Sequence, residues 1–340
     1  MDVPICLSHK TAWLLYHAPG RFEALERKYD YGIHAAAPMP KRLADCVVRF
    51  LEDCGVSARE LDAIDALVSF AFERSHSGGR FRTHSLGMPV FADYLVELVS
   101  GLLMVDPRLC FVQAASWLNE LELIEFGYEL CGSYELPIHT AAAWARPCGG
   151  GEVEYTARRP LTTRAALQKF VKSNSGLKGS RAAEKALVRV RDGSRSPMET
   201  ATALAIVMPR CRGGLGFKGV ELNRRIDIPD EFRNLTTSSY FEVDIFAPRR
   251  NAGVEYDGGT HEEATRRAHD VERLATLNAM GVSVQTLTKS QFANQLAFHR
   301  AMNAVARMFG CKAGSSIEFQ RAQNELRQAL IRNWTLGPRE

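Results

Sequence analysis

The stretch that decides the fold runs from Phe241 to Gly281 and reads FEVDIFAPRRNAGVEYDGGTHEEATRRAHDVERLATLNAMG. Apolar and acidic residues alternate over 241–246 and again over 254–257, and each run predicts a strand with one buried face. The Pro-Arg-Arg-Asn segment at 248–251 lies between them and is typical of a turn. The stretch therefore predicts a β-hairpin that is followed by a helix over 261–278.

Acidic residues end both strands of this hairpin. A turn centred on Arg249 and Arg250 places Asp244 directly opposite Glu255, with Asp257 further along the same face. Cross-strand partners lie about 5 Å apart at Cβ, where like charges repel. Convergent carboxylates bind Mg²⁺ or Mn²⁺, which polarises a phosphoryl oxygen and acidifies a bound water. We predict Asp244 and Glu255 as metal ligands and Asp257 as a further catalytic carboxylate.

Two structural interpretations of these acids stay open. The acids are exposed edge residues, or they pair with Arg249, Arg250 or Arg273. Arg266, Asp270 and Arg273 follow one another at i, i+4 and i+7, so they share one helix face and are able to pair among themselves. We predict Arg266 as a phosphate contact, and Asp270 and Arg273 as supporting residues.

His261 follows the hairpin through a Gly-Gly-Thr segment. Thr260 and Glu263 match a capping box, which predicts a helix start beside the acids. Backbone N–H groups at such a start attract phosphate, and His261 is predicted as general acid, general base or phosphate contact. A histidine at the start of a helix is also commonly a surface residue without a functional role. Gln285, within VSVQTLT, either supports the site or faces solvent.

Glu199 has two interpretations. In the segment Ser-Pro-Met-Glu at 196–199 it completes a capping box with Pro at the first helical position. It is also a candidate for a third metal ligand from the first helix of the core. The cap is the simpler interpretation of the sequence alone.

A basic block precedes this core. From Arg158 to Arg195 there are eleven Lys or Arg against two acids. Such a block suggests a surface that faces a phosphate backbone, although a solvated helix face is an equally common cause. The predicted contacts to nucleic acid are Lys178, Arg181, Lys185, Arg189, Arg249, Arg250 and Arg266.

Composition limits the class of protein. The 340 residues are 46% apolar and 24% charged, and the net charge of +4 identifies no partner by itself. The eight cysteines form no CxxC pair, which suggests reduced thiols and a cytoplasmic setting. No signal peptide and no apolar run long enough to span a bilayer is evident, so no membrane role is predicted.

The pattern of elements predicts an α/β protein with four segments. They are an N-terminal α/β recognition or regulatory module (1–160), a basic helical segment (161–195), a C-terminal α/β core (196–310) and a C-terminal helix (311–340). The core reads as helix, three strands, helix and strand, which predicts a mixed sheet flanked by helices. Further predictions are a helix over 57–72, a loop over 74–89, a strand over 95–105 and a helix over 290–308.

The core resembles the PD-(D/E)XK nuclease superfamily, in the branch similar to very-short-patch-repair endonucleases. The likeness rests on V-E-Y-D-G-G-T-H, then R-x-x-x-D-x-x-R and L-x-x-x-G up to Gly281. It implies that Asp244, Glu255 and Glu199 correspond to the acids of that family. The usual lysine is Asp257 here, so the positive group that orients water is unassigned, and His261, Lys289 or an arginine are substitutes.

The N-terminal segment more loosely resembles antitoxin-like regulators of abortive-infection systems. The residues that carry this likeness are L-S-H-K-T-A at 7–12 and L-M-V-D-P-R-L-C-F-V-Q-A-A at 103–115. The winged helix of those relatives is not evident in this sequence.

These observations together predict a cytoplasmic DNA endonuclease that depends on Mg²⁺ or Mn²⁺. RNA stays open as a substrate, as do a homodimer and an operon partner protein. The alternative is a DNA-binding regulator or antitoxin-like protein that does not cleave, with a nuclease fold that is only a scaffold. A partner-binding module of a defence or mobile-element operon is a third interpretation.

Overall fold

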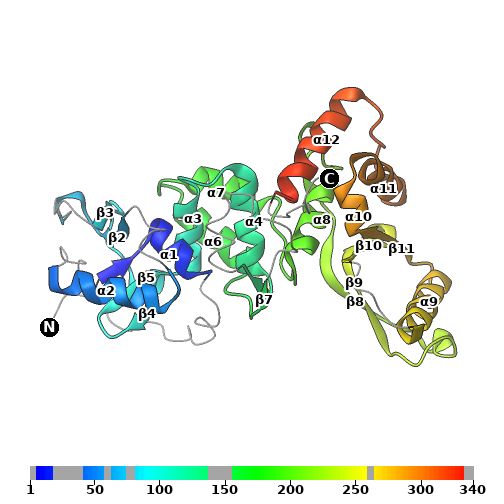
Figure 1. Cartoon of the computed structure of the whole chain (residues 1–340), viewed down its shortest axis with the longest axis horizontal. Helices are drawn as coiled ribbons and strands as arrows, with labels where there is room; N and C mark the ends of the chain where they lie inside the picture. Colours follow the sequence, from blue (N-terminus) through cyan, green and yellow to red (C-terminus); the bar gives the residue numbers. More distant parts are fainter. Residues whose placement is uncertain are drawn as a thin grey trace, which may run out of the picture. The chain divides into compact units, whose positions relative to one another are not determined.

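The computed structural model describes residues 5–17, 41–56, 63–73, 81–136, 155–258 and 264–332, although the side chains of 41–44 and 264–270 are not described. The described chain forms two compact units (Figure 1), one ending at residue 190 and the other beginning at residue 191. Both units are α/β with mixed sheets flanked by helices, which confirms the predicted class. Residues 161–190 of the predicted basic segment lie in the N-terminal unit, and 311–332 lie in the C-terminal unit.

The N-terminal unit contains a mixed sheet. Its strands in the order β3-β2-β1-β5-β4 are Phe81–Ser85, Ile64–Val68, Ile5–Leu7, Leu102–Val105 and Leu95–Val99. β1 is parallel to β5 and antiparallel to β2, whereas β2 and β3 are parallel. This order places β1 in the middle of the sheet, and helix α1 (His9–Leu15), which follows β1, packs against the neighbouring strand β2.

Three local predictions for this unit are wrong. Part of the predicted helix over 57–72 is strand β2, and the predicted loop over 74–89 contains strand β3. β2 is an inner strand with a nearly continuous buried run, and such a run lacks the alternation by which a strand is recognised. The predicted strand over 95–105 is a hairpin, because Gly101 has a φ of +82° and turns the chain between β4 and β5.

The helices of this unit lie between and after its strands. Their bounds are α1 His9–Leu15, α2 Lys41–Asp53, α3 Pro107–Ala114, α4 Glu120–Cys131, α6 Arg164–Ser173 and α7 Ser180–Leu187. Asp106 caps α3 by accepting the Leu109 N–H, with Pro107 at the first helical position. α6 and α7 pack on α3 and α4. A short ladder joins β6 (Tyr134–Glu135) to β7 (Thr156–Ala157).

The C-terminal unit has the element order that the sequence predicts for the core. Its sheet, in the order β11-β10-β9-β8, consists of Ser283–Thr288, Ala252–Asp257, Tyr240–Ala247 and Glu221–Asp227. Its helices are α8 Pro197–Val207, α9 Ala264–Ala279, α10 Lys289–Ala293, α11 Gln295–Met308 and α12 Ile317–Leu330. α8 packs against β9 and β10, whereas α9 packs against β11 (Figure 1). The helix predicted over 290–308 is two helices, because the chain breaks at Asn294.

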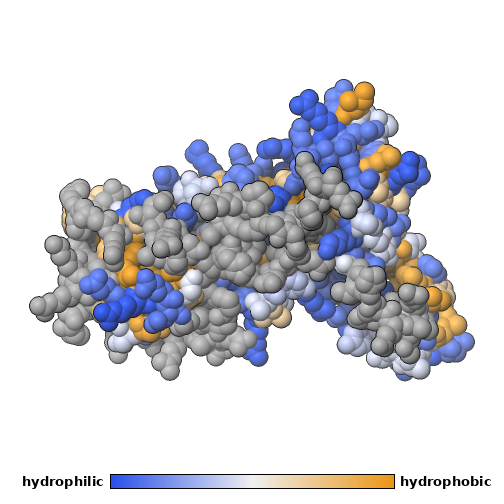
Figure 2. Space-filling view, in the orientation of Figure 1, coloured by the Kyte–Doolittle hydropathy of each residue, from blue (hydrophilic) through white to orange (hydrophobic). Residues whose placement is uncertain are grey.

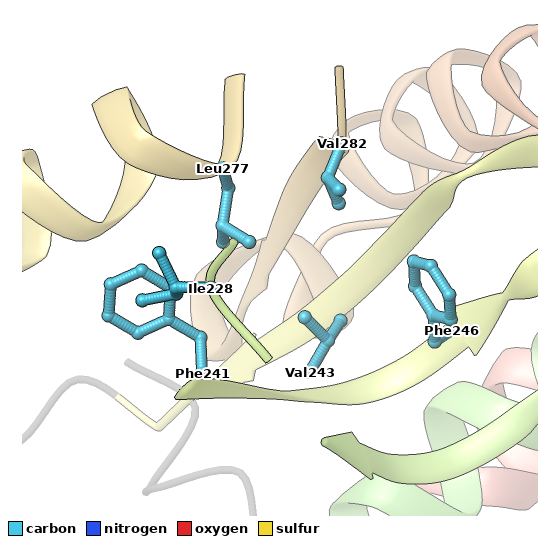
Figure 3. Close-up of a cluster of buried hydrophobic side chains, with 6 residues drawn as sticks. All are labelled: Ile228, Phe241, Val243, Phe246, Leu277 and Val282. Carbon is cyan, nitrogen blue, oxygen red and sulfur yellow. The ribbon is translucent and has the colours of Figure 1, made fainter. Parts of the chain in front are cut away.

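The hairpin is anchored by a hydrophobic cluster between β9 and α9. Phe241 and Val243 of β9 point toward Leu277 of α9, with Ile228 beside Phe241 (Figure 3). A Cβ added at Gly253 would lie 2.3 Å from Val243 Cγ1, so this position of β10 has room only for glycine. This packing fixes how the two strands that carry the acidic residues lie against each other.

Candidate functional site

The register of the hairpin agrees in phase with the sequence prediction. Ala252 pairs with Ala247 and Val254 with Ile245, so the next step of the ladder would pair Asp244 with Glu255. The regular ladder stops before that step. Instead, the backbone N–H of Tyr256 donates to Asp244 Oδ2 at 2.9 Å. The carboxylate of Asp244 therefore reaches across to β10 in the place where a backbone bond would continue the sheet.

Among the ionisable groups of the hairpin, Asp244 has the pKa that its surroundings shift most. Burial, together with the charges of Glu199 and Glu255, raises its pKa from 3.8 to about 6. The Tyr256 N–H and the charge of Arg273 act in the opposite direction and do not prevail. Acids from α8, β9 and β10 thus lie close enough to influence one another.

Glu199 forms the cap that the sequence predicts, and its side chain also faces Asn223. Ser196 Oγ accepts the Glu199 N–H at 3.1 Å, and Glu199 Oε2 accepts the Arg195 N–H at 2.8 Å, which fixes the start of α8. Asn223 Nδ2 also donates to Glu199 Oε2 at 2.6 Å. Burial raises the pKa of Glu199, and its charge acts on Asp244. The cap therefore holds this carboxylate beside the hairpin.

Asn223 of β8 was not predicted as a site residue. Leu222 pairs with Ile245 and Arg224 with Val243, so Asn223 lies opposite Asp244. Its φ of +47° is a left-handed conformation, which asparagine tolerates better than most residues. An asparagine in a strand-like run is the one sequence signal that pointed to this irregularity.

Glu255 is bound to a protein cation. Arg273 Nη1 donates to Glu255 Oε2 at 2.9 Å, and Arg273 Nη2 donates to Glu255 Oε1, which makes a two-pronged ion pair. Both side chains are less than one-fifth exposed. The alternative interpretation, in which an arginine holds the acid, therefore applies to Glu255.

A second ion pair lies beside Asp244. Arg195 Nη1 donates to Glu242 Oε2 at 2.6 Å, and this hydrogen bond lowers the pKa of Glu242. The charge of Asp244 contributes to a raised pKa of Arg195, after the larger effect of the bond to Glu242. Arg195 and Arg273 are thus two cations beside the acids, and the sequence leaves the place of the missing lysine open to an arginine without specifying which one.

The remaining predicted residues of the core are placed differently. Asp257 is exposed at the end of β10, where it pairs with Thr288 of β11. Gln285 pairs with Val254, and its amide donates to the Thr286 carbonyl at 3.0 Å. His261 lies outside the described residues. The side chains of Arg266 and Asp270 lie outside them as well.

The predicted phosphate contacts fall into two groups. Lys178, Arg181 and Lys185 are exposed in the N-terminal unit, whereas Arg189 donates to Glu120 Oε1 at 3.1 Å. Arg249 and Arg250 are exposed in the turn between β9 and β10. The basic residues of the N-terminal unit and the acids therefore belong to different compact units.

Asp244, Glu255 and Glu199 offer carboxylate oxygens, which are the type of ligand that a hard divalent cation prefers. Among the described residues, however, no three His, Cys, Asp or Glu side chains are grouped closely enough to hold a metal ion. The carboxylate of Glu255 already accepts hydrogen bonds from Arg273, and the carboxylate of Glu199 accepts them from Asn223 and from the start of α8. Binding of a metal would require at least Glu255 to exchange Arg273 for the ion.

The N-terminal unit contains a polar cluster that the sequence analysis missed. Asp65 of β2 is 2% exposed and accepts a bond from His84 Nε2 at 2.7 Å, with Arg82 at 3.7 Å. His84 stacks on His9, with ring centroids 3.6 Å apart. His9 has a φ of +48°, and its N–H donates to Gln113 Oε1 at 2.9 Å. The cluster joins the start of α1 to β2, β3 and α3.

The electrostatics of this cluster differ from those of the hairpin. Burial and the neighbouring His84 lower the pKa of His9 from 6.5 to about 3. The buried carboxylate of Asp65 is compensated by His84 and Arg82. Asp65 and His84 lie in the two segments predicted as helix and loop, which is why sequence reasoning did not bring them together.

No family model matches this chain, and no curated protein or solved structure matches it either. Within the described ranges, no helix has the length and apolar character that crossing a membrane requires. The assignment of function therefore rests on the geometry of the site.

Proposed function

We propose that the C-terminal unit is the core of a cytoplasmic, metal-dependent DNA endonuclease that hydrolyses phosphodiester bonds. Asp244 carries the proposal, because its pKa is raised to about 6 by burial and by the charges of Glu199 and Glu255. Carboxylates that repel one another in a partly buried place are stabilised by a bound cation. Strongly perturbed acids of this kind are typical of functional sites.

Each residue would have a defined part in this activity. Asp244 and Glu255 would hold Mg²⁺ or Mn²⁺, with Glu199 as a further ligand, and the ion would supply charge neutralisation and an acidified water. Arg273, once released from Glu255, would be free to contact a phosphate oxygen through its planar guanidinium.

Other predicted residues would extend the site. His261 would move a proton or contact a phosphate. The exposed Lys178, Arg181 and Lys185 would contact the DNA backbone.

A second candidate function is supported by one specific observation. Arg273 already neutralises Glu255 with a two-pronged ion pair. In a DNA-binding regulator that does not cleave, this pair would stabilise the fold in place of a metal. The two candidates therefore differ in whether Glu255 is available to an ion.

Cleavage of DNA by the full chain tests the proposal. Supercoiled plasmid, single-stranded DNA and RNA are incubated with Mg²⁺, Mn²⁺ or EDTA. Nicking that requires metal, is abolished in Asp244→Asn and persists in Asp227→Asn supports the endonuclease, since Asp227 is an exposed acid of the same sheet. Retention of DNA without cutting in any metal supports the regulator. Failure to bind nucleic acid, with capture of a partner protein, contradicts both.

A further inference from the structure

The C-terminal unit contains a pocket that is separate from the acidic hairpin. It lies where α10 and α11 meet α12 and has a volume of about 270 Å³. The surface over α12 is largely hydrophilic (Figure 2). The pocket is lined by Asn294, Gln295, Leu296, Phe298, His299, Gln320, Gln323, Asn324 and Arg327.

Arg327 brings a positive charge to the pocket without a counter-charge. It is 7% exposed, and its Nη1 donates to the carbonyls of Phe292 and Ala293 at 2.7 and 3.0 Å. Its Nε and Nη2 donate to Asn324 Oδ1 at 3.1 and 2.8 Å. All these acceptors are neutral, and within the part of the chain that the structure describes no carboxylate pairs with Arg327. A buried charge normally has a partner of opposite sign.

Gln323 presents a buried donor that has no acceptor. The residue is 2% exposed, and its Oε1 accepts from His299 Nδ1 at 2.7 Å. Asn303 Nδ2 donates to the other ring nitrogen of His299 at 3.0 Å, which fixes the tautomer and thereby the orientation of the Gln323 amide. Gln323 Nε2 is left buried and without a partner among the described residues. An unsatisfied buried donor is rare enough to require a cause.

The start of α11 points to the same kind of ligand. Asn294 caps this 14-residue helix by accepting the Ala297 N–H at 2.9 Å, and Gln295 and Leu296 of its first turn line the pocket. The N-terminal end of a helix favours negative charge. The nine lining residues include no aspartate or glutamate.

We propose that this pocket binds the oxyanion group, phosphate or carboxylate, of a small molecule. The oxyanion would accept bonds from Gln323 Nε2 and from the guanidinium of Arg327, and would neutralise its charge. The volume is slightly below that of pockets for drug-sized ligands, so the pocket fits a small anionic metabolite. The amides of Asn294, Gln295 and Gln320 would bind its polar remainder.

Asn324→Asp is the sharpest test. The new carboxylate would keep both bonds from Arg327 and add the missing counter-charge, so thermal stability is expected to rise while anion binding weakens. Gln328→Glu is the matched control, because it adds the same charge to an exposed position of the same helix. Gln323→Glu is a second variant, which keeps an acceptor for His299 and removes the free donor.

Binding is measured by calorimetry on the full chain at constant ionic strength, with inorganic phosphate, adenosine monophosphate and citrate as probes. Asn324→Asp and Gln323→Glu should each weaken binding about tenfold or more, and Gln328→Glu should leave it unchanged. Preference for the nucleotide or for citrate identifies the source of the oxyanion. Equal binding by all variants, binding of an oligonucleotide in place of small anions, or no binding by the natural chain overturns the proposal.

Discussion

The two units surround a carboxylate in opposite ways, with Asp65 buried and Asp244 half-buried. Asp65 in the N-terminal unit is bound by His84 and lies near Arg82, whereas Asp244 in the C-terminal unit lies near two other acids and accepts one backbone N–H. Compensation of a buried charge stabilises a fold, while accumulation of like charge opposes it. The comparison agrees with a structural role for Asp65 and with our proposal that Asp244 binds a cation.

The largest effect is expected from removing the compensated acid. Asp65→Ala would leave His84 and Arg82 without their partner, whereas the backbone N–H of residue 65 would still donate to Thr11 Oγ1. We predict that the free energy of unfolding of the N-terminal unit falls by about 3 kcal/mol. A denaturant titration with hydrogen exchange as the readout measures this change for the N-terminal unit alone. Arg82→Ala, an exposed partner, should cost much less. Equal effects of the two variants would mean that burial of Asp65 is not what matters.

The second effect concerns the ion pair that holds Glu255. Arg273→Met removes both bonds to a mostly buried carboxylate. In the absence of metal, we predict that the free energy of unfolding of the C-terminal unit falls by about 2 kcal/mol. Divalent metal should restore part of this loss, because it would replace the guanidinium at Glu255. A loss that metal leaves unchanged would favour the regulator over the endonuclease.

The third effect has the opposite sign. Because the pKa of Asp244 rises to about 6, the folded state keeps a proton that the unfolded state releases above about pH 4, so ionisation costs stability as the pH increases through this window. For a fully buried group, this pKa shift would lower the free energy of unfolding by roughly 3 kcal/mol. Because Asp244 is partly exposed, we expect the loss to be about 1–2 kcal/mol. Asp244→Asn should therefore stabilise the unit at pH 7.5.

The control for this prediction is the pH itself. The advantage of Asp244→Asn should shrink as the pH falls from 6 to 4 and disappear at about pH 3, where the natural carboxyl is protonated in both states. A variant that is less stable than the natural chain at pH 7.5 would show that Asp244 is compensated after all. Denaturant titrations at the two pH values give the measurement.

The smallest effect concerns His9. Its pKa is lowered to about 3, so the unfolded state takes up a proton below pH 6.5 while the folded state does not, and stability falls as the pH drops. Asn tolerates the left-handed backbone of His9. His9→Asn should therefore reduce the loss of stability between pH 7 and pH 5 by about 1 kcal/mol. An unchanged pH profile would place the acid sensitivity elsewhere, with His84, Asp65 or Lys178 as the neighbours to examine.

Short-range patterns in the sequence were sufficient for part of this account. The period-two alternation around the turn at 248–251 gave the phase of the hairpin, since each strand buries one face. The spacing from Ser196 to Glu199 gave the cap of α8. Both features depend on residues that are close in the chain.

Features that depend on tertiary packing were not predictable in this way. Arg195 and Asn223 reach the acids only because α8 packs against the sheet. The sequence predicts a helix where β2 lies, because an inner strand loses its alternation. Asn294, which separates α10 from α11, lines the pocket beside α12, and the helical pattern over 290–308 does not predict this break.

Binding of Mn²⁺ to the full chain tests the central claim most directly. If the acids around Asp244 form a metal site, calorimetry or electron paramagnetic resonance should detect one tightly bound Mn²⁺ per chain, which is lost in Asp244→Asn and kept in Asp227→Asn. Absence of binding by the natural chain, or binding that is the same in Asp244→Asn, would contradict the account.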